Sequence, residues 1–147
     1  MEAILLIGIQ GAGKSTFYQE RFFDTHVRLS LDVLKTRTRE TLLVQACLFA
    51  RAPFVVDNTN VLAADRARFI GPAREAGFRV VGYFFAPDVR GSIARTKKRA
   101  RKVSVPGILG TSKRLQMPAL EEGFDRLFQV RLTPENEFVV DEMAAAP

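Results

Sequence analysis

The chain has 147 residues, of which 47% are hydrophobic and 26% are charged, and these values are typical of one globular domain. Its longest apolar runs, such as Ala3–Ile7 and Val80–Ala86, are too short to cross a bilayer, and the acidic Glu2 argues against a signal peptide. The single cysteine, Cys47, excludes an internal disulfide and a cysteine-based zinc site, so we expect a cytoplasmic protein. The net charge of +6 suits binding to nucleic acid, phosphates or acidic membranes, and equally suits a general role in solubility.

The first half of the chain alternates short apolar runs with segments of helical spacing. Ala3–Ile7 is a continuous apolar run typical of a buried parallel strand, and we expect a helix from about Lys14 to Phe23 after it. Val27–Leu29 predicts a short second strand, and Leu31–Ala50, which contains no Gly or Pro, predicts a helix. Pro53–Asp57 is the next predicted strand, with its proline at the edge.

The second half continues the same alternation. Asn60 is a favoured N-cap residue for a helix over Val61–Ala76, and Gly77 fits the C-cap position of that helix. Gly71 and Pro72 inside this helix predict a kink or a break. The remaining predicted elements are a strand over Arg79–Ala86, a basic helix from about Val89 to Lys102, a short helix after Ser104–Gly107, and late strands over Leu127–Leu132 and Phe138–Val140.

This alternation of strands and helices predicts an α/β domain with a central, mostly parallel sheet. We expect a single domain over residues 1–142, with a helical lid at about 90–106 and a frayed C-terminal tail at 143–147. Ligands of such sheets bind beyond the carboxyl ends of the strands. Polar residues that directly follow a strand are therefore the candidate site residues.

The strongest chemical signal is the sequence GIQGAGKS at residues 8–15, which matches the full Walker A pattern between a predicted strand and a predicted helix. Its glycines let several backbone N–H groups point at an anion, and the helix adds its positive N-terminal end. Lys14 should reach the β- and γ-phosphates of ATP, and the Ser15 hydroxyl should hold Mg²⁺, so we expect a three-layer P-loop NTPase fold. The expected nucleotide contacts are Gly8, Gly11, Ala12, Gly13, Lys14, Ser15 and Thr16.

A kinase also needs a base beside the acceptor hydroxyl, and Asp32 is our candidate. The chain has no Asn-Lys-x-Asp motif, which disfavours a GTPase, and its only histidine, His26, is expected in a surface loop. Asp32 follows the strand Val27–Leu29, so we expect it at the ligand edge of the sheet, where it could equally cap a helix. On a helix that starts there, Lys35 and Arg39 would share the face of Asp32 and bind an anionic acceptor.

Two further groups of residues are candidates for the same site. Asp57 ends a predicted strand in the place of a Walker B carboxylate, where it could hold Mg²⁺ or its waters, although a turn with an Asx cap is the alternative. With it, Asn58, Thr59 and Asn60 are candidates for the acceptor and metal side.

A run of basic residues covers positions 90–102, with seven cations in thirteen residues and no acid among them. Within it, Arg95 and Arg99 stand at i and i+4 on one helix face, and arginine suits bidentate contact with phosphate. We expect a lid helix that closes on ATP and supplies an arginine to the γ-phosphate, the alternative being a solvated basic helix.

Taken together, these segments resemble the polynucleotide 5′-kinase branch of the P-loop kinases. The resemblance covers residues 4–132 approximately and rests on GIQGAGKST, LSLD, VVDNTN, and an Arg-x3-Arg lid that is followed by Val-Pro and by Pro-x3-Glu-Gly-Phe. The roles that it implies are ATP and Mg²⁺ binding at Lys14 and Ser15, general base on a 5′-hydroxyl at Asp32, lid arginines at Arg95 and Arg99 (the latter the better γ-phosphate candidate), and an acceptor and metal side at Asp57, Asn58, Thr59 and Asn60.

This resemblance has one departure, which concerns the acceptor. Viral members of the family carry an arginine three residues after the catalytic aspartate to grip a phosphate of the acceptor, and this chain has Lys35 there. Lysine offers a point charge without a bidentate fork, which leaves the acceptor preference open. We expect the kinase domain alone, so that 3′-end processing in nucleic acid repair would come from elsewhere.

Three functions remain open from the sequence. The first is a kinase that transfers the γ-phosphate of ATP to a 5′-hydroxyl end of DNA or RNA and grips the strand through its basic face. The second is a kinase for the hydroxyl of a small metabolite, because neither the fold nor the Walker loop fixes the acceptor. The third is an ATP-binding module without transfer activity.

Overall fold

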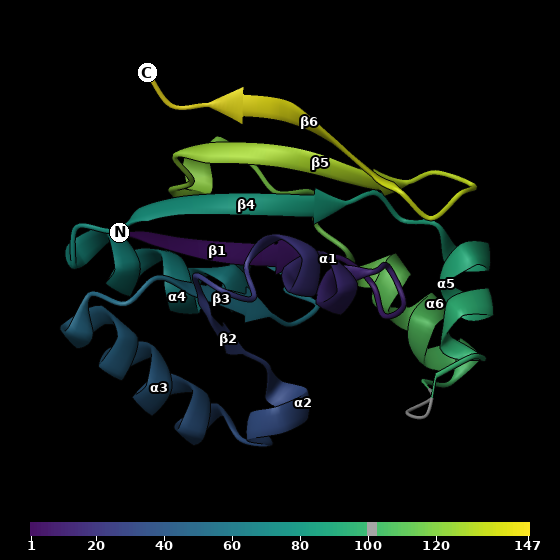
Figure 1. The fold of residues 1–147 in the computed structure, drawn as a ribbon, viewed down its shortest axis with the longest axis horizontal. Coiled ribbons are helices and arrows are strands. Elements are labelled where there is room, and N and C mark those ends of the chain that lie inside the picture. Colours follow the sequence, from purple (N-terminus) through teal and green to yellow (C-terminus); the bar gives the residue numbers. More distant parts are fainter. Residues whose placement is uncertain (100–102) are drawn as a thin grey trace.

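The computed structural model describes residues 1–99 and 103–147, and its centre is one twisted sheet (Figure 1). Six strands of the described chain follow the order β2-β3-β1-β4-β5-β6 across this sheet. Five of them run parallel, namely β1 (Glu2–Ile7), β2 (Val27–Leu29), β3 (Phe54–Asp57), β4 (Arg79–Phe85) and β5 (Arg126–Leu132). The edge strand β6 (Phe138–Ala145) pairs antiparallel with β5, so the predicted mostly parallel α/β sheet is confirmed.

Helices cover both faces of the sheet and give the domain three layers. Successive side chains of β1 point to opposite faces, as in any strand. Leu5 and Ile7 pack against residues of α3 and α4, whereas Ile4 and Leu6 pack against residues of α1 and α6. The helices are α1 (Lys14–Arg21), α2 (Leu31–Leu34), α3 (Arg37–Ala50), α4 (Ala63–Glu75), α5 (Val89–Thr96) and α6 (Val105–Arg114), with a 3-10 turn at Leu120–Glu122.

The helix predicted over Leu31–Ala50 is wrong as one element, because it is divided into α2 and α3. Lys35 ends α2 with a φ of 74°, a left-handed conformation that no helix interior accepts. The Thr36 hydroxyl then accepts a hydrogen bond from the Arg39 backbone N–H and caps the start of α3. The chain therefore starts a new helix after Thr36 although the spacing of its apolar residues is compatible with one helix, and the side chains of α3 do not continue the faces of α2.

Three other boundaries differ from the prediction. Asn60 does not cap α4, which begins after Leu62 as its N-cap residue, and α4 continues through Pro72 without a break. The basic helix α5 ends at Thr96, ahead of the predicted end at Lys102, which lies outside the described residues with positions 100 and 101. Strand β6 extends to Ala145, so part of the predicted tail belongs to the sheet.

The carboxyl ends of β1 and β4 point towards α5 and α6, which lie together at one end of the molecule (Figure 1). The loop between β1 and α1 lies at this same edge. Among residues 1–99 and 103–147, no helix combines the length and hydrophobicity required to cross a membrane. The fold thus places the phosphate loop at the edge of the sheet formed by the carboxyl ends of its parallel strands.

Candidate active site

The phosphate loop at residues 8–13 joins β1 to α1 and has the backbone that its glycines predict. Gly11 and Gly13 have φ angles of 75° and 97°, which residues with a Cβ adopt only under strain. A Cβ on Gly11 would also lie 2.6 Å from the carbonyl oxygen of Ser92 on α5. The loop is therefore packed tightly against α5, and only glycine fits where they meet.

Lys14 is the first residue of α1, and its side chain is buried. Its Nζ donates hydrogen bonds of 2.8 Å to the carbonyl oxygens of Gly8 and Ile9. Burial lowers the pKa of the Lys14 ammonium from 10.5 to about 8, with Arg99 lowering it further and the carboxylates of Asp57 and Asp32 opposing the shift. Lys14 is thus a desolvated cation whose ammonium is held against the backbone of the phosphate loop.

The oxygens expected to hold a metal ion lie at the start of α1 and the end of β3. The Ser15 hydroxyl donates a 2.9 Å hydrogen bond to Oδ2 of Asp57, whose side chain is buried. A hydroxyl and a carboxylate beside a phosphate loop are oxygen donors of the kind that Mg²⁺ prefers, so these residues fit the ion. Within the described residues, no group of three or more His, Cys, Asp or Glu side chains could hold a metal.

The segment Asp57–Asn60 contacts three other parts of the chain. The Asn58 side chain accepts a hydrogen bond from Leu31 N–H at 2.9 Å and donates one of 2.8 Å to the buried Glu40. The Thr59 carbonyl accepts a hydrogen bond from Gly8 N–H at 2.9 Å. The Asn60 side chain donates to the carbonyl of Leu6 at 2.9 Å. Asn58, Thr59 and Asn60 thus position their neighbours through these contacts.

A single cavity of about 590 Å³ joins the phosphate loop to the other candidate residues. Asp32 and Arg99 both line it, together with the Asp57–Asn60 segment. The described residues that line this cavity are Gln10, Gly11, Lys14, Ser15, Arg28, Leu31, Asp32, Arg37, Asp57, Asn58, Thr59, Asn60, Asp65, Arg99 and Val103. The general-base candidate, the phosphate loop and one lid arginine therefore share one chamber.

The prediction that Asp32, Lys35 and Arg39 share one helix face is wrong, because the break at Lys35 separates them. Neither Lys35 nor Arg39 is among the cavity-lining residues, and both are exposed. Arg37, the first residue of α3, lines the cavity instead and donates a 2.8 Å hydrogen bond to Glu40. Arg37 is thus the cation of this segment that lines the cavity, in place of the predicted Lys35 and Arg39.

Arg95 and Arg99, the two arginines predicted to belong to a lid, occupy different environments. Arg95 on α5 donates a 2.5 Å hydrogen bond through Nε to the carbonyl oxygen of Gly11, and burial lowers the pKa of its guanidinium. Arg99 lies beyond the end of α5, is exposed and lines the cavity. Arg95 therefore supports the phosphate loop in this structure, whereas Arg99 lines the cavity.

A buried ion pair links α4 to the Pro-x3-Glu-Gly-Phe motif. The Arg66 side chain is fully buried and donates two hydrogen bonds, of 2.7 and 3.1 Å, to the two carboxylate oxygens of Glu122. A third hydrogen bond, of 2.8 Å, joins Arg66 to the carbonyl of Asn60. This pair fixes the end of the Asp57–Asn60 segment, which gives the distant motif a positional role.

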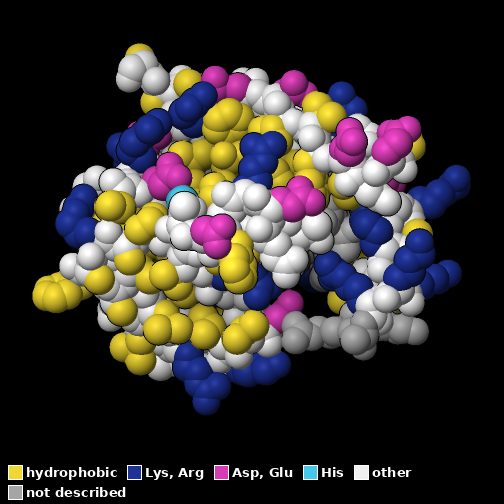
Figure 2. Space-filling model, viewed as in Figure 1, with side chains coloured by type: hydrophobic (Ala, Val, Ile, Leu, Met, Phe, Trp, Pro, Cys, Tyr) yellow, Lys and Arg dark blue, Asp and Glu magenta, His cyan; other side chains and the backbone are white. Residues whose placement is uncertain are grey.

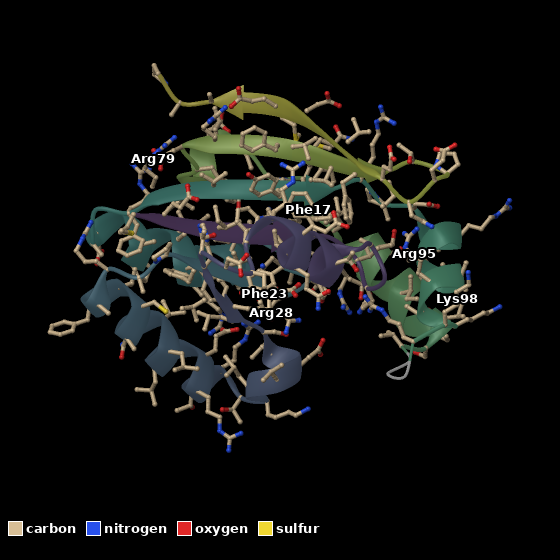
Figure 3. The ribbon with its side chains drawn as sticks, viewed as in Figure 1. Phe17, Phe23, Arg28, Arg79, Arg95 and Lys98 are labelled. Carbon is tan, nitrogen blue, oxygen red and sulfur yellow. The ribbon has the colours of Figure 1, made fainter. Side chains whose placement is uncertain are left out.

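Sequence reasoning missed six of the described residues that line the cavity, namely Gln10, Arg28, Leu31, Arg37, Asp65 and Val103. Arg28 on β2 donates hydrogen bonds to Asp57 and Ser15, and Figure 3 shows it reaching from β2 while Arg95 reaches from α5. A cation in a strand that leads to the ligand edge was the available signal. Gln10 donates a 2.9 Å hydrogen bond to Thr111 of α6, a contact between residues 101 positions apart that no local pattern predicts.

The sequence of this chain is similar to a known protein family and to a characterised relative. A family model named AAA_33 and described as an AAA domain matches residues 4–119. A bifunctional polynucleotide phosphatase/kinase of Schizosaccharomyces pombe is 28% identical over 137 residues, covering 88% of this chain and 33% of that protein. The chain therefore spans about a third of the length of this curated relative.

Solved structures show the same fold at low sequence identity. Kti12 of Chaetomium thermophilum, in complex with ADP-AlF3, has a TM-score of 0.66 at 14% identity, with 88% of each chain covered. A gluconokinase from Sinorhizobium meliloti 1021 has a TM-score of 0.61 at 16% identity, covering 88% of this chain and 82% of that chain. The chain thus has the fold of a P-loop kinase-like domain.

Proposed function

The chain belongs to the AAA_33 family of AAA domains, and on that premise we propose that it is an ATP-dependent kinase that phosphorylates 5′-hydroxyl ends of DNA or RNA. The observation that carries this proposal is the shared cavity, in which Asp32 lies in one chamber with Lys14 and Arg99. The relative from Schizosaccharomyces pombe supports the choice of a polynucleotide acceptor.

In the proposed reaction, the acceptor hydroxyl oxygen attacks the γ-phosphorus of ATP in line with the leaving group. A new P–O bond forms as the bond to the β–γ bridging oxygen breaks, ADP departs, and Asp32 takes the hydroxyl proton. Lys14 and Arg99 lie close enough to each other to interact electrostatically. Both stabilise negative charge on the phosphoryl group during its transfer. Mg²⁺, when bound at Ser15 and Asp57, would supply further positive charge beside the β- and γ-phosphates.

Basic side chains near the chamber suit a polyanionic acceptor. Arg37 lines the cavity on the α3 side, and Arg99 lines it on the α5 side. Figure 2 shows further Lys and Arg side chains gathered over the α5 and α6 end of the molecule. A strand that enters between these elements would meet cations on both sides, in addition to the phosphate loop.

One observation favours a small metabolite hydroxyl as the second candidate acceptor. No aromatic side chain is found among the cavity-lining residues that the structure describes, so this chamber offers a terminal base no ring on which to stack. A polynucleotide acceptor would then rely on phosphate contacts, whereas a compact polar metabolite would need no stacking surface. The identity of the acceptor is therefore the first property to measure.

The test is transfer from γ-labelled ATP with Mg²⁺ to 5′-hydroxyl DNA and RNA oligonucleotides, a 5′-phosphorylated control strand and a pool of small hydroxyl compounds. We expect label on the 5′-hydroxyl strands alone, and a rate loss of roughly 100-fold or more for Asp32→Asn with ATP binding retained. Asp24→Asn, in the loop that precedes β2 at the opposite edge of the sheet, is the matched control and should keep full activity. Label only in the small-molecule pool would select the second candidate, and ATP binding without any label would select the non-transferring module.

A further inference from the structure

Arg28 places a cation on the same oxygens that are expected to hold the metal ion. Its Nε donates a 2.8 Å hydrogen bond to Oδ2 of Asp57, and a terminal nitrogen of the same guanidinium lies 2.8 Å from that oxygen. This terminal nitrogen also donates to the Ser15 hydroxyl at 3.2 Å. Both protein oxygens of the proposed metal site are therefore engaged by one side chain.

A guanidinium and a divalent ion compete for this position. Like charges repel strongly over a few ångströms where burial lowers the dielectric, and the Asp57 side chain is only 3% exposed. The described residues contain no larger cluster of carboxylate or imidazole ligands that would draw the ion in unaided. The phosphates of a nucleotide would supply further oxygen ligands, and their negative charge would favour the divalent ion over the Arg28 guanidinium at this position.

We propose that Arg28 controls access to the metal site. While its guanidinium is bound to Ser15 and Asp57, a divalent ion without nucleotide does not bind there, and the guanidinium is displaced when the ion arrives together with a nucleotide. The inference rests on the metal part of the proposed function and is independent of the acceptor. Its consequence is an order of binding, because the ion enters as a metal–nucleotide complex. Arg28 then acts as a positioning residue for metal loading.

The surroundings of Arg28 allow such a displacement. Its side chain is 30% exposed, and it comes from β2, a three-residue strand at the edge of the sheet. The guanidinium carbon lies 6.0 Å from the centre of the Tyr18 ring, whose hydroxyl is held by a hydrogen bond to the His26 carbonyl. Partial exposure gives the guanidinium room to move away from Asp57, and the neighbouring Tyr18 ring offers it a cation–π contact.

Binding of Mn²⁺, followed by the loss of its free-ion signal in electron paramagnetic resonance, tests the proposal without any transfer reaction. In the absence of nucleotide, we expect Arg28→Gln to tighten Mn²⁺ binding by roughly 10-fold or more, because the ion would no longer have to displace a charged hydrogen-bond donor from the Asp57 carboxylate. Arg37→Gln is the matched control, since it removes the same charge from the same cavity without touching Asp57. With ADP present, the wild-type protein should bind Mn²⁺ tightly, and the difference from Arg28→Gln should shrink.

Two results would overturn the inference in distinguishable ways. Equal Mn²⁺ affinities of Arg28→Gln and Arg37→Gln without nucleotide would show that Arg28 does not keep the ion out of the site. This result would not contradict the proposed metal site. Failure of the wild-type protein to bind Mn²⁺ even with ADP would contradict the metal site itself.

Nitrogen-15 NMR of the wild-type Arg28 Nε–H provides a second readout that needs no variant. This proton should exchange slowly with water in the free protein and faster with Mg²⁺ and ADP, and unchanged exchange would contradict displacement.

Discussion

The buried ammonium of Lys14 should make the ligand-free protein less stable at neutral pH than at alkaline pH. Its pKa falls from 10.5 to about 8 on folding, with burial as the largest cause. Between these two values the unfolded chain holds a proton that the folded chain has released. Folding stability must therefore rise with pH across this window, since the unfolded state binds more protons. Below pH 8 both states are protonated, and the folded protein carries the full cost of the buried charge.

The size of this effect follows from the difference of 2.5 between 10.5 and 8. Each pKa unit corresponds to about 1.36 kcal/mol, so the cost at neutral pH is about 3 kcal/mol. Lys14→Met removes the titrating group and keeps an unbranched side chain of similar length. We expect the free energy of unfolding of the wild-type protein, relative to this variant, to increase by roughly 2–3 kcal/mol from pH 7 to pH 10.

Urea unfolding at several pH values measures this difference, and the subtraction cancels the titration of groups that both proteins share. A wild-type minus variant difference that stays constant from pH 7 to pH 10 would refute the reasoning, whatever its absolute size. Nucleotide binding gives an independent check, because a phosphate beside Lys14 should return the proton. Calorimetry at pH 8.5 in buffers of different ionisation enthalpy should then detect proton uptake, which should vanish at pH 6.5.

Three further variants test the packing and the acceptor side. Gly11→Ala should destabilise the protein by about 1–3 kcal/mol and abolish the nucleotide-induced rise in melting temperature, because the new Cβ meets a carbonyl of α5 in a left-handed backbone; an unchanged rise would contradict the tight packing. Arg66→Met should cost about 1–3 kcal/mol in urea unfolding, because the Glu122 carboxylate, which is 17% exposed, would lose its arginine and keep only the hydrogen bond from Ala119 N–H, and an unchanged stability would argue against a structural pair. Arg37→Gln should raise the acceptor KM more than Lys35→Gln does in the transfer assay, and the reverse order would place the acceptor outside the cavity.

The sheet and the phosphate loop could be predicted because their signals are local. Continuous apolar runs locate the central strands, and the spacing of Gly8, Gly13 and Lys14 specifies a loop whose geometry depends on backbone freedom and one cation. The strand boundaries of β2 and β3 follow from the same reasoning. Each of these features depends on residues that are neighbours in the sequence, so the pattern carries the information by itself.

The residues predicted to bind the acceptor could not be placed in the same way, because the break at Lys35 changes which side chains of the following helix face the cavity. Helical spacing across Leu31–Ala50 is compatible with a single helix, and only the left-handed backbone at Lys35 and the cap at Thr36 divide it. Two positions of displacement rotate a helical residue by about 200°, which is enough to carry a side chain to the opposite face. Arg37 therefore lines the cavity in place of Lys35 and Arg39, although all three belong to the same basic segment.

The Asp57–Asn60 segment explains why a site assembled from distant parts still has a compact sequence signature. Asp57 supplies an oxygen to the proposed metal site, while the Asn58 side chain holds the backbone N–H of the residue before Asp32. The next two residues hold the start of the phosphate loop and the end of β1. One tetrapeptide thus sets the distances among the base candidate, the metal oxygens and the phosphate loop. It makes these contacts within the protein, so its presence supports phosphoryl transfer at this cavity more strongly than it supports any one acceptor.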